Sequence, residues 1–298
     1  ISGLRVDNYK DHGSIFSPSL HLKYNPGEWL SFRLNAGTGF RIVNLFSEDH
    51  AFVTGQREVK ILEELQPERS KSIILNSNYI YSGLSGTGNL DLDIFYTHFS
   101  NKIIPSYENI RYIIYKNSKG YAYTKGFSGA WNHTFLNGIA FTLNFNHQIA
   151  KYYESNTISN IEHSPNWTVS LNFKLPFKNR WSLNTSSNFT GEMQLPVVFD
   201  MNSNGELSKF PRPVRSNPFS IHNINISGEL NNNHEIYFGL LNVLNFRQKE
   251  SSLVAFNDPN HNKGFSPFFD TSYVYAPNQG VEFFLGYKFN LNDLSKRK

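Results

Sequence analysis

The sequence predicts an all-β protein whose antiparallel strands form a transmembrane β-barrel. Three observations predict this fold: apolar residues at every second position, connections that alternate between short and long, and many aromatic residues. Aromatics make up 15% of the 298 residues, with 26 Phe, 16 Tyr and 4 Trp, although the mean hydropathy is only −0.44. Because successive side chains on a strand point to opposite faces, this combination indicates strands with one apolar and one polar face.

The alternation is clearest in residues 137–149, which read NGIAFTLNFNHQI. The turn-like Asn137-Gly138 is followed by a run in which the odd positions are large and apolar and the even positions are mostly polar. The apolar set is Ile139, Phe141, Leu143, Phe145 and Ile149, and the other set is Ala140, Thr142, Asn144, Asn146 and Gln148. One face of this strand must therefore contact an apolar medium, either a protein core or a lipid bilayer.

The same pattern recurs along the chain and predicts about twelve strands, on the basis of the roughly ten-residue segments typical of membrane barrels. It is found in residues 20–24, 30–36, 90–97, 167–175, 181–189 and 281–291. The segment FSIHNINIS changes phase, because Phe219 and Ile221 are odd whereas Ile224 and Ile226 are even. A β-bulge or a late strand start would explain this change.

The connections alternate in length. Five short turns are predicted at 25–28 (NPGE), 85–89 (SGTGN), 136–138 (LNG), 177–180 (FKNR) and 231–234 (NNNH). Five long polar segments lie between them, at about 41–72, 104–120, 153–165, 193–217 and 246–279. This rhythm is typical of outer-membrane barrels, which have short periplasmic turns and long extracellular loops.

Aromatic and charged residues favour lipid over a protein core as the apolar medium. Aromatics are expected at strand ends near turns, where interfacial girdles form: Trp29, Trp167, Trp181, Tyr24, Phe135 and Phe177. Charges fall on the polar phase, where they would face a watery lumen: Lys23, Arg33, Asp91, Asp93 and Lys174. The aromatics alone would also suit ordinary strands, because aromatic residues favour strands in general.

Composition excludes several classes of function. The net charge of +4 comes without a basic stripe, which argues against a nucleic-acid partner. The chain has no cysteine, which excludes disulfides, thiolate metal sites and cysteine nucleophiles. No catalytic motif for a serine hydrolase, nucleotide hydrolase or zinc enzyme occurs, so we expect no enzyme, no catalytic residue and no resident cofactor.

Each candidate functional site also has a simpler structural explanation. DMNSNGE (200–206) resembles the start of a calcium loop, but Pro211 replaces the expected Glu, so a polar turn is expected and no metal site. His50, His163 and His261 lie in long connections and are expected to be solvated, although they could contact a metal chelate or haem. Asp91 and Asp93 could mimic paired catalytic carboxylates or form a lumen wall. A solvated charged flank is expected from Glu63, Glu64, Glu68, Arg69 and Lys71.

Five segments resemble TonB-dependent outer-membrane receptors, especially those of Bacteroidetes. They are FSPSLHLKYNPGEWLSFRLNAGTGFRIVNLFSED (16–49), LEELQPERS (62–70), LDLDIFYTHFSNKI (90–103), FGLLNVLNFRQ (238–248) and SPFFDTSYVYAPNQGVEFFLGYKFNL (266–291). Their order is that of the C-terminal half of the barrel. The resemblance implies that residues 1–291 are the C-terminal part of a 22-stranded barrel, followed by a polar basic tail (292–298), and that the N-terminal plug domain and the first strands are missing.

The resemblance also implies a function: active uptake across the bacterial outer membrane of a scarce ligand such as a ferric siderophore, haem, cobalamin or another metal chelate. The TonB–ExbB–ExbD complex would supply energy through the missing plug. Ligand contacts are expected from loops 41–72, 193–217 and 246–279. The remainder of the receptor, or a second chain, would complete the barrel within outer-membrane lipid.

Two alternatives stay open at the level of sequence. The first is a self-contained passive porin or translocator of about twelve strands, an even number that permits closure. Pairing of residues 2–9 with 281–290 would favour this porin, whereas open edges would favour the receptor. The second alternative is a soluble β protein acting as a binding module, with its apolar side chains inside a closed core.

Overall fold

The computed structural model describes residues 1–42, 58–61, 63–106, 112–177, 180–201, 206–231, 233–249 and 271–289. The predicted basic tail at 292–298 lies outside the described residues, as do His50 and His261. No helix in these ranges is long and apolar enough to span a membrane.

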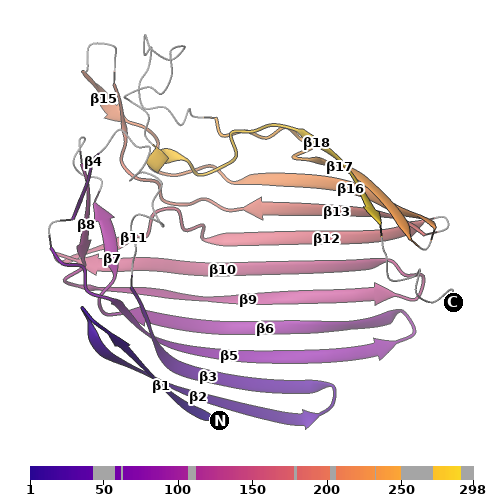
Figure 1. Cartoon of the computed structure of the whole chain (residues 1–298), viewed down its shortest axis with the longest axis horizontal. Coiled ribbons are helices and arrows are strands. Elements are labelled where there is room, and N and C mark those ends of the chain that lie inside the picture. Colours follow the sequence, from indigo (N-terminus) through magenta and orange to yellow (C-terminus); the bar gives the residue numbers. More distant parts are fainter. Residues whose placement is uncertain are drawn as a thin grey trace.

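One large antiparallel sheet dominates the molecule (Figure 1). Neighbouring strands in the sheet follow one another along the chain, so the sheet is an up-and-down meander. Its strands in order are β1 (Ser2–Tyr9), β2 (Gly13–Gly27), β3 (Leu30–Arg41), β5 (Glu68–Gly83), β6 (Gly86–Phe99), β9 (Tyr121–Phe135), β10 (Ala140–Glu154), β12 (Trp167–Phe177), β13 (Trp181–Thr190), β16 (Phe219–Asn231), β17 (His234–Leu241) and β18 (Glu282–Phe289), with β11 (Thr157–Asn160) paired to the end of β10. The prediction of about twelve antiparallel strands is confirmed.

Short and long connections lie at opposite ends of the strands, as predicted. Each of the five predicted turns lies at a hairpin: β2–β3, β5–β6, β9–β10, β12–β13 and β16–β17. The turn predicted at 85–89 is displaced, because β5 ends at Gly83 and β6 already begins at Gly86. We call this the turn end of the sheet. The connections between β3 and β5, β6 and β9, β10 and β12, β13 and β16, and β17 and β18 lie at the opposite, loop end, together with the short β1–β2 turn.

The two faces of the sheet differ in chemistry because the strands keep the predicted alternation in register. One row across the sheet pairs Asn76 with Asp93, Asp93 with Ser128, and Asn146 with Thr168. The adjacent row pairs Leu75 with Ile94 and Ile94 with Phe127. Residues of the first kind form what we call the polar face, and residues of the second kind form the apolar face.

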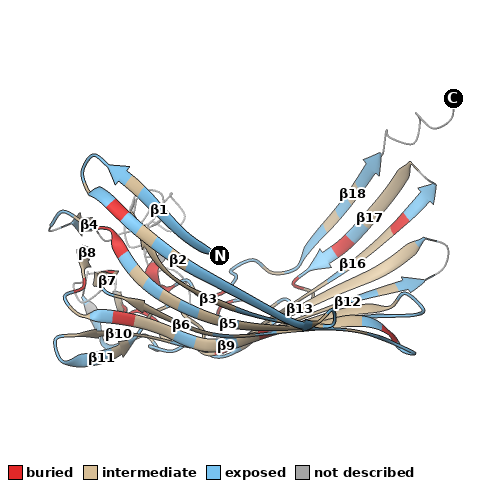
Figure 2. Cartoon of the chain, turned by 90° about the horizontal axis from the view of Figure 1, so that it is seen from below, coloured by how far each residue is buried: buried red, intermediate tan, exposed pale blue. Residues whose placement is uncertain are grey.

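Curvature assigns each face to a side of the sheet. The sheet bends into an open trough (Figure 2), and side chains on the concave side of a curved sheet crowd together. On β6, Asp91, Asp93 and Phe95 are partly buried, whereas their neighbours on the apolar face are open to the surroundings. Leu92, Ile94 and Tyr96 are 43%, 63% and 41% exposed. The polar face is therefore the concave, inward side, and the apolar face points outward without any protein layer over it.

The large sheet does not close on itself within the described residues. β1 pairs only with β2, and β18 pairs only with β17, so the edges of the trough stand apart (Figure 2). Residues 2–9 and 281–290 are thus not partners, which was the pairing expected of a self-contained barrel. The soluble alternative also required the odd-numbered side chains of 139–149 and 167–175 to lie in a closed interior, and in the part of the chain that the structure describes no second sheet covers them.

The long connections contain secondary structure of their own. β4 (Glu58–Ile61), β7 (Ile103–Ser106) and β8 (Tyr112–Asn117) form a three-stranded sheet at the loop end. β14 (Phe199–Met201) pairs with β15 (Leu207–Pro211), and a short 3-10 helix, η1, covers Thr271–Tyr273. The predicted loop 41–72 was too long, because Arg41 ends β3 and β5 already begins at Glu68.

Both explanations offered for the phase change near residue 221 are wrong, because β16 already begins at Phe219 and has no bulge at Ile221. β16 pairs with β13 in one continuous register from Phe219 to Gly228, and no shift occurs across Ile221 and Ile224. Ile224 and Ile226 belong to the apolar face, whereas Phe219 and Ile221 are on the polar phase. Phe219 stacks on Phe246 with ring centroids 5.1 Å apart. This apolar residue lies on the polar phase because it packs against the loops.

Aromatic side chains gather on the apolar face at both ends of the strands. At the turn end, Trp29 contacts Tyr79 edge to face, and the Trp131 indole N–H donates to the Tyr81 hydroxyl (2.9 Å). Trp181 begins β13 at this end, as predicted. Trp167 was predicted beside a turn, but it begins β12 at the loop end, because β12 runs from the loops toward the turns. Aromatic belts at two heights are what two membrane–water interfaces favour.

Replacing Ile94 by arginine places a charge in the middle of the outward face. We expect Ile94→Arg to lower the free energy of unfolding of the full-length protein in lipid vesicles by about 2–4 kcal/mol, because an outward charge at mid-membrane must be dehydrated. Ser128→Arg is the matched control, since it puts the same charge on the polar face opposite Asp93. Denaturant titration in vesicles measures both, and equal losses in the two variants would contradict the assignment of the faces.

Candidate functional site

The loop end carries two small hydrophobic cores, whereas the large sheet has none beneath it. The first core lies in the β4–β7–β8 sheet and consists of Ile103, Ile113 and Tyr115, with Val59 and Leu65 packed against them. The strings IIPS and YIIY supply these residues inside connections that are otherwise polar. The connections around this core are therefore folded structures that can hold side chains in fixed positions.

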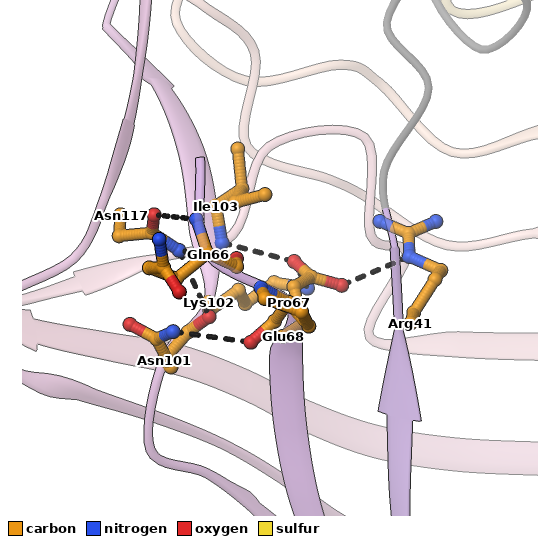
Figure 3. Close-up of polar contacts among 8 residues, drawn as sticks. All are labelled: Arg41, Gln66, Pro67, Glu68, Asn101, Lys102, Ile103 and Asn117. Carbon is orange, nitrogen blue, oxygen red and sulfur yellow. Dashed lines mark hydrogen bonds and ion pairs between the residues drawn. The ribbon is translucent and has the colours of Figure 1, made fainter. Parts of the chain in front are cut away.

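Glu68 fastens this first unit to the wall of the large sheet (Figure 3). Its carboxylate accepts from the Arg41 guanidinium (2.9 Å) and the Ile103 backbone N–H (2.9 Å), and lies 3.7 Å from the Lys102 ammonium. The side chain is only about 5% exposed. The prediction that Glu68 is solvated is wrong, because two cations and a backbone donor compensate its dehydration. Glu63, Glu64, Arg69 and Lys71 are exposed, as predicted.

The second core joins two connections far apart in sequence, β13–β16 and β17–β18. It consists of Met193, Leu195, Val198 and Tyr273, with Phe219 and Tyr275 against them. Its backbone is held through Gln248, whose amide donates to the Tyr273 carbonyl (3.1 Å) and accepts from the Tyr275 N–H (3.0 Å). The Tyr273 hydroxyl donates to the Pro213 carbonyl (2.6 Å). Parts of the predicted loops 193–217 and 246–279 thus form one unit.

A polar cavity of about 340 Å³ lies among these folded connections. Its walls come from β7 and β8, from the β10–β11 hairpin, and from the segments around Glu162 and Val197. Its charged groups are Lys116 and Glu154, which form an ion pair at 3.0 Å, and Glu162, and its hydroxyl groups come from Tyr152, Ser155, Thr157 and Ser159, among others. Tyr152 and Glu154 are on the polar phase of β10, so the cavity opens on the inward side. Such a lining can bind a polar ligand through hydrogen bonds and charge.

Two neighbouring titratable groups beside this cavity have shifted pKa values: Glu162, which is partly buried, and His163, whose side chain is exposed. Dehydration raises the pKa of the Glu162 carboxyl, and dehydration lowers the pKa of the His163 imidazole, although its hydrogen bond to the Ser272 carbonyl (2.9 Å) acts in the opposite direction. A lowered pKa means that the folded state binds this proton less readily than the unfolded chain. The contribution of His163 to stability is therefore lost as the pH falls below about 6.5, the ordinary value for histidine, whereas the raised pKa of Glu162 acts in the opposite direction, because the folded state binds that proton more readily.

Asp91 and Asp93 form part of a hydrogen-bonded wall, which was one of the two alternatives for them. Asp91 accepts from the side-chain amides of Asn78 (2.7 Å) and Asn89 (2.6 Å), and Asp93 accepts from Asn76 (2.9 Å). Carboxylates held by fixed amide donors across neighbouring strands suit a rigid lumen wall. The face continues with asparagine, serine and threonine on β9 to β16, so its inner surface is wettable along its whole width.

The remaining candidate ligands are used within the protein or lie outside the described residues. The Asp200 carboxylate accepts from Arg212 at 2.6 Å, and residues 202–205 of the calcium-like string are not among those described. His163 binds a backbone carbonyl through its ring nitrogen, so it is held in place. Within the described ranges, no group of three or more His, Asp or Glu side chains could hold a metal ion.

Lys116, Glu154, Glu162 and Gln248 were not predicted from the sequence. Glu154 ends β10 beyond the alternating segment at 137–149, the other three lie outside the strands of the large sheet, and their grouping depends on how the connections fold over the strand ends. The apolar strings at 103–104 and 112–115 were the available signal, because hydrophobic residues in a long connection indicate that it has a core of its own. The burial of Glu68 had no signal of this kind.

The family described as TonB dependent receptor-like, β-barrel matches residues 1–243. The chain belongs to this family. No curated protein matches it.

Solved structures of siderophore receptors share its fold. A mutant of the ferric enterobactin receptor PfeA of Pseudomonas aeruginosa superimposes with a TM-score of 0.67 at 15% identity, over 97% of this chain and 42% of the receptor. The siderophore receptor PirA of Acinetobacter baumannii gives 0.65 at 14%, over 97% and 43%. The ferric-catecholate import receptor Fiu of E. coli K12 gives 0.61 at 12%, over 93% and 35%. The chain therefore spans less than half of each of these receptors.

Removing the Glu68 carboxylate should release the first folded connection from the wall of this TonB-dependent receptor-like barrel. In Glu68→Ala the Ile103 N–H loses its acceptor and the two cations lose their partner, so we expect at least tenfold faster amide exchange at Ile103. Glu64→Ala, at an exposed acidic position four residues away, is the control and should leave exchange unchanged. Identical exchange in Glu68→Ala and in the native protein would contradict the anchoring role.

Acidification should loosen the second core through His163. Between pH 7.5 and 5.5, on either side of the ordinary histidine pKa, we expect falling protection factors for the Tyr275 and Ala276 amides, which bond to Gln248 beside η1. His163→Gln, which cannot be protonated, should remove most of this fall. Hydrogen exchange corrected for intrinsic rates gives both values, and the same fall in both proteins would assign the effect to another group.

Proposed function

We propose that this chain forms part of an outer-membrane receptor that takes up a scarce, bulky ligand such as a ferric siderophore, haem, cobalamin or another metal chelate. The observation that carries the proposal is the difference between the two faces of one curved sheet, one of which is apolar and the other polar. An outward apolar face with aromatic belts at both ends suits lipid, and an inward face of amides, hydroxyls and paired charges suits a wet lumen. The membership of the barrel family supports this assignment.

The open edges support completion of the barrel by further strands. Unpaired N–H and C=O groups along β1 and β18 would each cost several kcal/mol in hydrocarbon, where water cannot satisfy them. We infer that strands from the remainder of the receptor, or from a second chain, pair with both edges. The coverage of less than half of the matched receptors supports the same inference. A plug domain from that remainder would fill the trough and receive energy from TonB–ExbB–ExbD.

Ligand contacts would come from the folded connections at the loop end, which would be the extracellular side. The predicted loops 41–72, 193–217 and 246–279 contribute the two small cores, and the 340 Å³ cavity lies beside them. Three of the solved structures with this fold are named as receptors for ferric enterobactin, ferric catecholates or siderophores. This naming supports ferric chelates as the first ligand class to test, ahead of haem and cobalamin.

Transport in cells tests the proposal against the passive porin. We expect cells that make the full-length protein to accumulate a radiolabelled member of a panel of ferric siderophores, haem and cobalamin, and to lose this uptake when TonB is disrupted. Uptake that persists without TonB and rises linearly with concentration would favour the porin. Absence of uptake of every member of the panel, with the protein present in the outer membrane, would contradict the proposal.

Replacing a charge in the cavity tests which end of the sheet meets the ligand. Glu162→Gln keeps the size of the side chain but removes its charge, so we expect the half-saturation concentration for uptake to change at least threefold, with the sign set by the charge of the ligand. Glu229→Gln, which makes the same change at the turn end of the polar face, is the control. Unchanged uptake in Glu162→Gln would remove the cavity from the ligand path.

A further inference from the structure

The two faces of the large sheet differ in the sign of the charges that they carry. Burial of one face in a membrane would disfavour charges of both signs on it, so it does not by itself explain this difference. Every carboxylate on the described strands of the large sheet lies on the polar phase: Asp7, Glu68, Asp91, Asp93, Glu154, Glu229, Glu235 and Glu282. The apolar face also carries charges, but all of them are positive. They are Arg69 and Lys71 on β5, Lys125 on β9 and Lys151 on β10.

These four cations gather at the loop end. Lys71 is level with His98, His98 with Tyr123, and Tyr123 with Lys151, so one row crosses four neighbouring strands. Lys125 lies in the row below, between Tyr96 and Ile149. None of the four has an ion-pair partner among the described residues. We call the four cations and the tyrosines around them the basic belt.

Tyrosine rings form the frame of the basic belt. Tyr123 stacks on Tyr96 and on Tyr121 with ring centroids 6.4 and 6.5 Å apart, and Tyr121 stacks on Tyr153 at 5.2 Å. The Lys125 ammonium lies 5.8 Å from the centre of the Tyr123 ring. This surface therefore offers ammonium and guanidinium groups beside phenol hydroxyls, all of which can donate hydrogen bonds to an anion.

The height of the basic belt fits the outer membrane surface. On β5, Lys71 lies ten residues from Tyr81, which belongs to the girdle at the turn end. Ten residues of strand extend about 33 Å, and a tilt of about 40° leaves about 25 Å across the membrane, the usual height of the apolar band. The cations thus lie where the headgroups of the leaflet at the loop end would be.

We infer that the basic belt binds the phosphate groups of an acylated lipid in the leaflet at the loop end. This inference rests on the proposed place of the protein in the outer membrane. The surface suits a lipid more than a free anion, because exposed isoleucines adjoin the cations. Ile73 and Ile149 lie in the row of Lys125 and are 48% and 38% exposed, and Ile94 lies in the next row toward the turn end and is 63% exposed, which provides an apolar track for acyl chains. Lysine stems lie along such a track while their ammonium groups reach the headgroups.

The test uses the full-length protein in nanodiscs of phosphatidylcholine and measures binding of fluorescent lipid A, a glycolipid with two phosphates. The variant combines Lys71→Gln, Lys125→Gln and Lys151→Gln. The control combines Lys23→Gln, Arg33→Gln and Lys174→Gln, which removes the same charge from the polar face. Since each headgroup-level cation contributes roughly fivefold in affinity, we expect about hundredfold weaker binding for the first variant and nearly native binding for the control.

Three further measurements distinguish binding of a lipid from binding of a free anion and test the membrane placement itself. Dephosphorylated lipid A should bind native protein at least tenfold more weakly, and inorganic phosphate should not compete. Equal losses in variant and control, equal binding of the dephosphorylated lipid, or effective competition by inorganic phosphate would overturn the lipid site. Failure of the native protein to float with phosphatidylcholine vesicles would instead overturn the membrane placement, and the proposed function with it.

Discussion

The pairing of backbone hydrogen bonds between neighbouring strands is the constraint on which the rest of this structure depends. A single curved sheet leaves no layer of protein to cover its outward face, so the medium itself must accept the apolar side chains there. In hydrocarbon a strand is tolerated only when both of its edges are paired. The continuous registers from β1 to β18 satisfy this requirement across the sheet and leave it open only at the two outer edges. The alternation, the turn lengths and the need for further strands all follow from that one condition.

The distribution of buried residues is the reverse of that in a soluble β protein. Ile113, Leu195 and Tyr273 are almost fully buried in the connections, whereas Leu92 and Ile94 in the strands are not. In the proposed membrane placement the strands would derive their stability from the bilayer, whereas the connections have small cores of their own. Glu68 joins the large sheet to the first folded connection. It is the first residue of β5, and its carboxylate accepts from the Arg41 side chain in β3 and from the Ile103 backbone N–H in β7. The proposed ligand surface is thereby attached to a rigid support.

The sequence predicted the wall well and the loop end poorly, for physical reasons. Alternation along a strand is a local property, so Phe141, Leu143 and Phe145 could be assigned to the apolar face from their spacing alone. The five hairpin turns were equally local. The phase change at Phe219 was attributed to a bulge or a late strand start, because its cause, packing on Phe246, lies in a distant connection. Glu68 and Trp167 were misplaced for the same reason: burial in loops and the direction of a strand depend on partners that no local pattern shows.

The most direct test of the account is a spin-label scan of residues 140 to 148 in the full-length protein within lipid vesicles, made practical by the absence of cysteine from this chain. Oxygen concentrates in hydrocarbon, whereas a charged nickel chelate stays in water. We expect labels at 141, 143 and 145 to collide preferentially with oxygen and labels at 142, 144 and 146 with nickel, so that accessibility alternates with a period of two. Equal accessibility of both sets to both reagents, or an alternation of opposite phase, would contradict the claim that the apolar face meets lipid.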